Sequence, residues 1–275
     1  MTGPLISAAD LDTLLPGRGV TVLDVRYRMG GPGGPEEYVL GHIPHAQYVD
    51  LDSALAAAPG PRGRHPLPDP EVFGAAMRLA GVSTGRPVVV YDDWEGRAAA
   101  RCWWLLRHHG HPDVRVLDGG WSHWVALGGD VEDGMRLPLS GDFEPGPGIL
   151  PVLAPEEVLA FAEDHVLVDA RNPERFRGEV EPVDPVAGHI PGSVNVPTGT
   201  NVRADGTFRS PAELRALYAA EGVLPDGPAG AYCGSGVTAA HDLLALAAAG
   251  IDGVLYPGSW SEWVADPSRP VATGS

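Results

Sequence analysis

The sequence repeats itself once over most of its length, and this duplication limits the possible folds more than any other feature. Leu23-Asp24-Val25-Arg26 returns as Val168-Asp169-Ala170-Arg171, and Gly41-His42-Ile43-Pro44 returns as Gly188-His189-Ile190-Pro191. A tryptophan-rich segment near the end of each half is repeated in the same order. Solenoid repeats are only about 20–45 residues long, so a period of this length indicates two copies of a whole domain.

The boundary between the copies is expected in the segment 128–151, which is rich in glycine, proline and acidic residues and lacks sustained periodicity. The expected division is an inactive first domain over residues 1–130, a linker over 131–150 and a catalytic second domain over 151–275. The full length of 275 residues leaves an ordinary domain size for each copy.

Each copy alternates short apolar runs, typical of buried strands, with longer helical patterns. The expected strands are 20–23, 87–91 and 114–117 in the first copy, and 165–168, 230–232 and 253–256 in the second. The expected helices are 70–80, 97–109, 211–221 and 237–249. This alternation predicts an α/β fold in which each copy has a mostly parallel central sheet flanked by helices.

The composition excludes several functions. The chain has no lysine, so all 19 basic residues are arginine, and the net charge is −17. The absence of lysine excludes pyridoxal-phosphate chemistry and a Walker A loop. A polyanion is not attracted to nucleic acid or to an anionic membrane, so we expect neither as a partner. The two cysteines cannot form a four-cysteine zinc site or a disulfide framework, and we expect no bound metal.

The chain shows neither a signal peptide at its N-terminus nor an apolar run long enough to cross a membrane. We therefore expect a protein of the reducing cytoplasm, where both cysteines stay as thiols.

The segment that carries the chemistry runs from Tyr232 to Ala240, after an expected strand and into an expected helix. Functional sites of open α/β sheets form at the carboxyl ends of strands, which is where Cys233 falls. Gly234 and Gly236 allow the backbone N–H groups to turn inward, and the helix N-terminus would stabilise a thiolate. A lone cysteine is often only a small buried residue, but this context favours a nucleophile.

The first copy provides an internal comparison. Its corresponding segment, Tyr91 to Ala98, has no cysteine and carries acidic residues, so we expect it to be inactive. Cys102 lies inside the next helix and is interpreted as a packing residue. A phosphatase loop of the form Cys-x5-Arg is disfavoured in the second copy, because its arginine position is Ala239 and no basic residue lies between Gly234 and Ala240.

Taken together, these motifs resemble those of tandem rhodanese-domain sulfurtransferases, over roughly Leu5 to Pro270. The loop Cys-Gly-Ser-Gly-Val-Thr is similar to that of 3-mercaptopyruvate sulfurtransferases, whereas thiosulfate sulfurtransferases usually carry basic residues there. The resemblance implies that Cys233 takes sulfur from the donor as a persulfide and passes it to a thiol, thioredoxin or cyanide, without a metal or organic cofactor. Two alternatives stay open: thiosulfate as the preferred donor, and a non-catalytic sulfur-carrier or regulatory module.

The resemblance also implies roles for individual residues. Arg175 matches an arginine that binds the donor carboxylate. A second substrate arginine is expected about nine residues later but is missing from 181–185, and Arg177 is the candidate to replace it. His42 matches a first-domain histidine that would form a proton relay with Ser235. Surface salt bridges and a strand cap are the structural alternatives for these arginines and for His42. The remaining expected loop positions are Gly234, Gly236, Val237 and Thr238.

Overall fold

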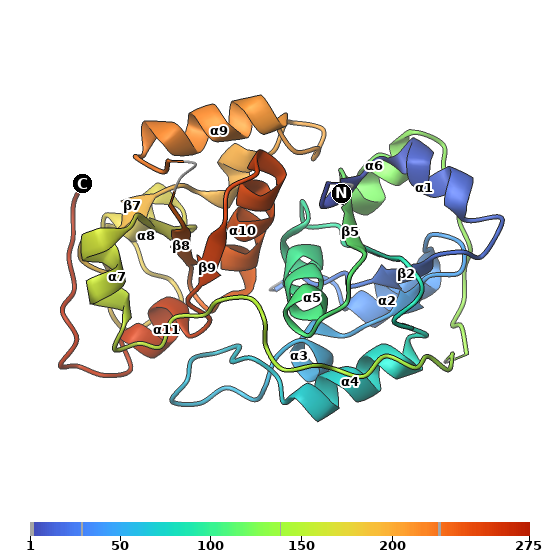
Figure 1. Ribbon diagram of the computed structural model, residues 1–275, viewed down its shortest axis with the longest axis horizontal. Helices are drawn as coiled ribbons and strands as arrows, with labels where there is room; N and C mark the ends of the chain where they lie inside the picture. The colour runs from blue at the N-terminus through green and yellow to red at the C-terminus, as the bar shows by residue number, and fades with distance from the viewer. Residues whose placement is uncertain (1–2, 29, 138, 225–226) are drawn as a thin grey trace. The chain divides into compact units, whose positions relative to one another are not determined.

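The computed structural model describes residues 3–28, 30–137, 139–224 and 227–275 (Figure 1). The chain forms two compact units. Unit 1 comprises Met1–Ala57, Pro68–Leu150 and Arg203–Phe208, and unit 2 comprises Ala58–Leu67, Pro151–Val202 and Arg209–Ser275. The segments 58–67 and 203–208 therefore belong to the unit opposite to the one that their position in the sequence suggests.

Unit 1 contains a five-stranded sheet in the order β1-β5-β4-β2-β3, with every neighbouring pair parallel. Its strands are β1 (Leu5–Ile6), β2 (Thr21–Asp24), β3 (Gln47–Tyr48), β4 (Val88–Tyr91) and β5 (Val114–Leu117). Its helices are α1 (Ala8–Leu14), α2 (Gly34–Leu40), α3 (Leu51–Ala54), α4 (Pro70–Leu79), α5 (Arg97–His108) and α6 (Gly120–Ala126).

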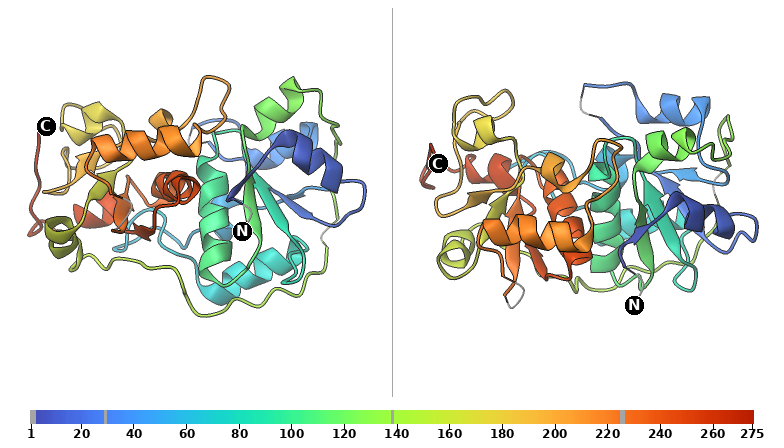
Figure 2. Two further views of the ribbon diagram at one scale, coloured as in Figure 1. Left: turned by 45° about the horizontal axis from the view of Figure 1, so that its top comes forward. Right: turned by 90° about the horizontal axis from the view of Figure 1, so that it is seen from above.

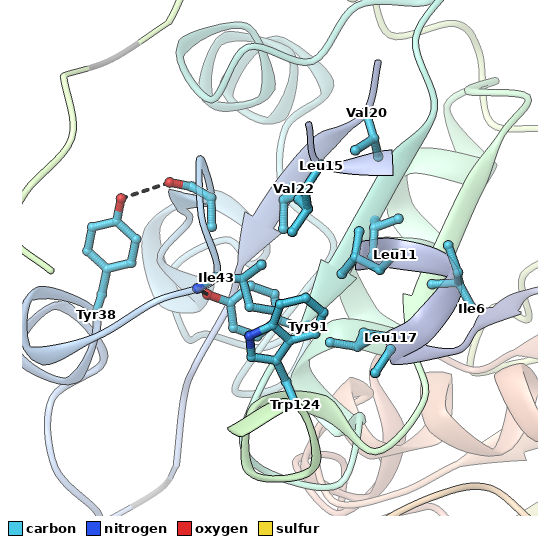
Figure 3. Packing of buried hydrophobic residues seen from close by; sticks show 13 residues of the cluster. Ile6, Leu11, Leu15, Val20, Val22, Tyr38, Ile43, Tyr91, Leu117 and Trp124 are labelled. Carbon is cyan, nitrogen blue, oxygen red and sulfur yellow. Dashed lines mark hydrogen bonds between the residues drawn. The ribbon is translucent and has the colours of Figure 1, made fainter. Parts of the chain in front are cut away.

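The sheet of unit 1 is covered on both faces, which explains its continuous apolar strands. Alternate residues of β4 point to opposite faces. Val89 and Tyr91 pack with Leu11 of α1 and Trp124 of α6 in one buried cluster (Figure 3). Helix α5 lies on the other face of the sheet (Figure 2). The expected linker packs along this unit, since the backbone of Glu132 pairs in both directions with that of His42.

Unit 2 repeats the plan with a four-stranded parallel sheet in the order β7-β6-β8-β9. Its strands are β6 (Leu167–Asp169), β7 (Val194–Asn195), β8 (Ala229–Tyr232) and β9 (Gly253–Leu255). Its helices are α7 (Val158–Asp164), α8 (Pro173–Phe176), the 3-10 helix η1 (Thr198–Asn201), α9 (Pro211–Ala220), α10 (Val237–Ala249) and α11 (Ser259–Trp263). The expected α/β fold with two parallel sheets is thus confirmed.

Helix α10 begins five residues after the end of β8, and a glycine fixes the turn between them. Gly236 is the N-cap and has the left-handed φ of +79°. A methyl group at this position would also lie 2.2 Å from the carbonyl oxygen of Pro257, so glycine is required for both reasons. The loop Cys233–Gly236 is therefore held at the carboxyl edge of the sheet.

Within the described residues, no helix is both long and apolar enough to cross a membrane.

Candidate active site

The sulfur of Cys233 faces the N-terminus of α10. The Sγ atom accepts a hydrogen bond from the Gly236 N–H at 3.1 Å, and the residue is only 1% exposed. The loop backbone is held by α11, because the carbonyl oxygens of Cys233 and Gly234 accept the N–H groups of Trp260 and Ser261, each at 2.9 Å. A backbone donor and the partial positive charge of a helix thus stabilise negative charge on this sulfur.

Ser259 is a functional candidate that the sequence analysis missed. Its hydroxyl accepts the Cys233 N–H at 3.1 Å, donates to the Tyr256 carbonyl oxygen at 3.0 Å and lies 4.0 Å from Cys233 Sγ. Ser259 is fully buried with a φ of +53°, a conformation that costs a non-glycine residue energy. Its counterpart in the first copy, Gly120, has a φ of +60°. The presence of serine in the second copy, where the first copy has glycine, is the sequence feature that could have identified this residue.

Ser235 has a histidine partner, but it is His65. The His65 Nδ1 atom lies 2.8 Å from the Ser235 Oγ atom, and both residues are partly exposed. His65 belongs to the segment 58–67 of unit 2. The sequence indicates His65 only weakly, as a histidine of the first half that has no counterpart in the second copy.

The expected pairing of His42 with Ser235 is therefore wrong. His42 is fully buried in unit 1, its Nδ1 atom lies 3.0 Å from the Tyr38 carbonyl oxygen, and its ring stacks on Tyr38. His189 makes the same contacts in unit 2, with its Nδ1 atom 2.8 Å from the Phe176 carbonyl oxygen and its ring stacked on Phe176. The repeated histidine is thus a structural residue of each copy.

Arg175 lies beside Gly234 of the loop. Its guanidinium forms a two-point contact with Glu181, with the Nη2–Oε1 distance 2.6 Å and the Nε–Oε2 distance 3.1 Å. Although burial opposes it, the hydrogen bond from Arg175 and two backbone N–H groups keep the pKa of Glu181 below its ordinary value. Arg177 instead forms a salt bridge with Glu179 on the surface, where both side chains are exposed.

The second arginine at the loop is Arg64, which the sequence analysis also missed. A methyl group added to Gly234 would lie 2.8 Å from Arg64 Nη2 and 3.6 Å from Arg175 Nη1. The Arg64 side chain forms an ion pair with Asp184, and its backbone N–H donates to the Ser261 Oγ atom at 3.1 Å. Arg64 replaces Arg177 as the neighbour of the loop because the fold places the segment 58–67 in unit 2.

The remaining expected loop residues lie at the start of α10. Val237 is its first residue and is buried, while Thr238 is partly exposed. In the described parts of the chain, no group of three or more His, Cys, Asp or Glu side chains could hold a metal ion.

The corresponding loop of unit 1 is occupied by one of its own side chains. The carboxylate of Asp92, which follows β4 as Cys233 follows β8, accepts N–H groups from Trp94, Gly96 and Ala99, each at 2.8 Å. Asp92 thus fills the anion position at the N-terminus of α5 and leaves no room there for an external anion. Cys102 is fully buried within α5, and burial raises the pKa of its thiol well above the ordinary value.

A cysteine that follows a central parallel strand and faces the N-terminus of the next helix defines the class of α/β protein to which this fold points. A family model described as rhodanese-like domain matches residues 7–127 and 154–266. The chain therefore belongs to the rhodanese family, with one domain in each half, and the tandem sulfurtransferase architecture is confirmed.

The chain is similar to named proteins over nearly its whole length. A Mycobacterium tuberculosis protein with the provisional name thiosulfate sulfurtransferase SseB is 45% identical over 280 residues, which cover 98% of this chain and 97% of that protein. A Pseudomonas aeruginosa protein provisionally named 3-mercaptopyruvate sulfurtransferase is 43% identical over 98% of each chain. The crystal structure of SseA from Escherichia coli, a 3-mercaptopyruvate sulfotransferase by its description, has a TM-score of 0.84 at 35% identity and covers 94% of this chain and 100% of that one.

Proposed function

We propose that this protein is a sulfurtransferase that moves sulfur from 3-mercaptopyruvate through a persulfide on Cys233 to a thiol, thioredoxin or cyanide. The observation that carries the proposal is the environment of Cys233: its Sγ atom faces the Gly236 N–H, and two guanidinium groups lie beside the adjacent Gly234. A nucleophilic sulfur and a binding site for an anionic donor are thus adjacent.

In the first half-reaction, the Cys233 thiolate attacks the sulfur of 3-mercaptopyruvate. A sulfur–sulfur bond forms, the carbon–sulfur bond of the donor breaks, and its electron pair remains on the donor as the enolate of pyruvate. One proton then converts the enolate to pyruvate. We assign this proton delivery to Ser235 and His65, whose 2.8 Å contact connects the hydroxyl of the loop to an imidazole, a side chain suited to general acid–base catalysis.

In the second half-reaction, an acceptor thiolate or cyanide attacks the outer sulfur of the persulfide. The sulfur–sulfur bond breaks and its electron pair returns to Cys233 as a thiolate, which the Gly236 N–H and the helix N-terminus stabilise. The cycle needs no oxidant, metal or organic cofactor. A reducing compartment such as the cytoplasm suits a mechanism that depends on a free thiol.

Thiosulfate is the alternative donor. The loop residues Gly234–Gly236 carry no cationic side chain, but Arg64 and Arg175 approach Gly234 from other segments, and guanidinium groups bind sulfonate-like oxygens as well as carboxylates. The similarity to the mycobacterial protein, with its thiosulfate sulfurtransferase name, keeps this alternative open. Relative turnover on the two donors distinguishes them, and a large preference for thiosulfate would contradict our assignment.

Intact-mass measurement tests the persulfide. We expect the wild-type protein to gain the mass of one sulfur atom when mixed with 3-mercaptopyruvate, and to lose it on addition of cyanide. Cys233→Ser should abolish the gain, whereas Cys102→Ser is the matched control and should retain it, because Cys102 is buried within α5. Full turnover by Cys233→Ser would exclude the mechanism. A persulfide that forms and can be discharged, but without multiple turnovers, would favour the carrier alternative.

A further inference from the structure

Six side chains of alternating charge form a continuous chain of ion pairs in unit 2. In order, they are Asp169, Arg171, Glu181, Arg175, Asp184 and Arg64. The side chains from Asp169 to Glu181 are at most 3% exposed, whereas Arg175 is 17% and Arg64 is 30% exposed. The chain of ion pairs thus begins in the interior and ends with two partly exposed guanidinium groups beside Gly234.

Asp184 fixes the two terminal arginines relative to one another. Its Oδ1 atom pairs with Arg64 Nη1, and its Oδ2 atom lies 3.3 Å from Arg175 Nη2. In the parts of the chain that the structure describes, Arg64 Nη2 and Arg175 Nη1 make no hydrogen bond. These unused nitrogens are also among the atoms closest to the methyl position of Gly234. Each guanidinium is therefore held by one edge and presents N–H groups with its other edge.

We propose that Arg64 is a donor-binding residue that forms, with Arg175, a two-arginine clamp for the carboxylate of a 2-oxo acid at the surface of Gly234. This assignment rests on the proposed sulfurtransferase function and adds its specificity residue. The carboxylate would accept N–H groups from both arginines while the donor sulfur extends toward Cys233, the neighbour of Gly234.

Arg64 is better placed to bind a ligand than to anchor its own segment. The segment is already anchored by the bonds of the Arg64 N–H to Ser261 and of His65 to Ser235. Pairing with Asp184 pre-orders the guanidinium, which reduces the entropy lost when a ligand binds. Because residue 234 has no side chain, the free edges of both guanidinium groups can lie close to its backbone. A protein with a net charge of −17 also needs a local cationic site to hold an anionic donor.

The first test compares Arg64→Ala, Arg64→Lys and the control Arg62→Ala, which removes an exposed arginine two residues away. We expect Arg64→Ala to raise the KM for 3-mercaptopyruvate about tenfold or more, the effect of losing charge-assisted hydrogen bonds. Arg64→Lys should recover this only in part, because an ammonium group cannot replace the planar fork of the guanidinium. Arg62→Ala should leave KM unchanged.

A second variant fills the clamp without removing either arginine. Gly234 does not have a positive φ, so Gly234→Ala is tolerated by the backbone, and its methyl group would lie within contact of the flexible end of Arg64. We expect this variant to raise KM for 3-mercaptopyruvate in the same way and to keep the wild-type melting temperature. A wild-type KM in Gly234→Ala would contradict the proposed position of the carboxylate.

One further measurement separates binding from folding. Once Cys233 carries the outer sulfur, a thiol acceptor that has no carboxylate can remove it, and this step does not involve the donor carboxylate. A ligand role predicts that Arg64→Ala discharges at the wild-type rate, whereas a merely structural role predicts slower discharge together with a lower melting temperature. An unchanged KM in Arg64→Ala would overturn the inference while the function stands. Absence of persulfide in the wild-type protein would overturn the proposed function itself.

Discussion

At the scale of single residues, the two histidines His42 and His65 differ in whether the duplication repeats them. His42 has a counterpart, His189, with the same carbonyl contact and the same stacked ring, so its position is part of the fold. His65 has none and contacts the hydroxyl of Ser235. A residue that serves the domain is repeated in both copies, whereas a residue that serves the site is needed only in one.

This difference predicts opposite consequences of substitution. His65→Gln should lower kcat with 3-mercaptopyruvate by about 10²-fold, the usual contribution of a proton-transfer group, and leave the melting temperature near that of the wild type. His42→Gln should keep kcat but lower the free energy of unfolding by about 1–3 kcal/mol, because it disturbs a buried hydrogen bond and a stacked ring. Steady-state kinetics and thermal unfolding of both variants check this. A His42 variant with normal stability and low kcat would instead favour a proton relay between His42 and Ser235.

The residues of the candidate site differ in how well the sequence predicted them. The sequence predicts Cys233 and Ser235 as site residues because a local pattern, two glycines between a strand and a helix, determines their environment. Arg64 and His65 lie in a loop about 170 residues before Cys233, and no local pattern shows which unit that loop joins. Ser259 contacts Cys233 through a tertiary turn. The sequence therefore could not predict the residues that long-range packing brings to the site.

At the scale of elements, the same strand–loop–helix unit occurs twice, with a different side chain facing the start of the helix in each copy. After β4, Asp92 places its carboxylate on three N–H groups at the start of α5. After β8, Cys233 places its sulfur on the Gly236 N–H at the start of α10. Both helices have a glycine N-cap in the left-handed conformation. In both copies, backbone N–H groups at the start of the helix thus face the residue that follows the strand, which is a carboxyl side chain in one copy and a thiol in the other.

The N-cap of α10 gives a prediction at this scale. Gly236→Ala should destabilise the protein by more than the ~1–2 kcal/mol cost of a left-handed alanine, because its methyl group would also lie 2.2 Å from the Pro257 carbonyl oxygen. Relief of that contact would displace the Gly236 N–H from Cys233, so persulfide formation should fall as well. Equilibrium urea unfolding and intact mass measure the two effects.

The C-cap of the same helix is the matched control. Gly250 has a similar φ of +77°, but a methyl group there would meet nothing closer than 4.0 Å. Gly250→Ala should therefore lower stability by the strain alone and leave persulfide formation unchanged. Equal loss of activity in both variants would show that general destabilisation, rather than the position of the N–H group, is the cause.

The long helices were predictable, whereas the two-residue strands were not. Helix α10 has the predicted bounds, and α5 ends one residue earlier than expected, because a dozen residues with capping signals leave a clear pattern. Strands β1, β3 and β7 have two residues each, too few for any periodicity, and form only because the sheet edge offers a partner. The central strands were found, whereas these edge strands were missed.

At the scale of the whole molecule, each unit is a complete α/β layer structure, but the chain does not divide between them at one point. Unit 2 includes the segment 58–67, which supplies Arg64 and His65 to its loop. Unit 2 cut out as 151–275 would therefore lack two residues of the candidate site. The candidate site of the second copy is therefore completed by a segment from the first half of the chain.

The stability of the whole molecule should depend on pH through buried histidines of unit 1. His111 is 1% exposed, and burial lowers its pKa; burial also lowers that of His108. In the unfolded chain both titrate near pH 6.5, so below that pH the unfolded state binds more protons than the folded state. The free energy of unfolding should therefore keep its full value above about pH 6.5. Below that pH it should fall as the pH decreases, by up to about 1.4 kcal/mol per pH unit for each histidine.

Urea unfolding between pH 7.5 and pH 5.5 measures this slope, and two variants identify its source. His111→Gln should make the slope shallower, since glutamine keeps a donor for the Ser83 carbonyl oxygen, 3.2 Å from His111 Nε2, and takes up no proton. His165→Gln changes an exposed histidine of unit 2 and should leave the slope unchanged. If His111→Gln retains the full slope, the acid sensitivity comes from the carboxylates of this acidic chain, and the buried histidines of unit 1 do not set it.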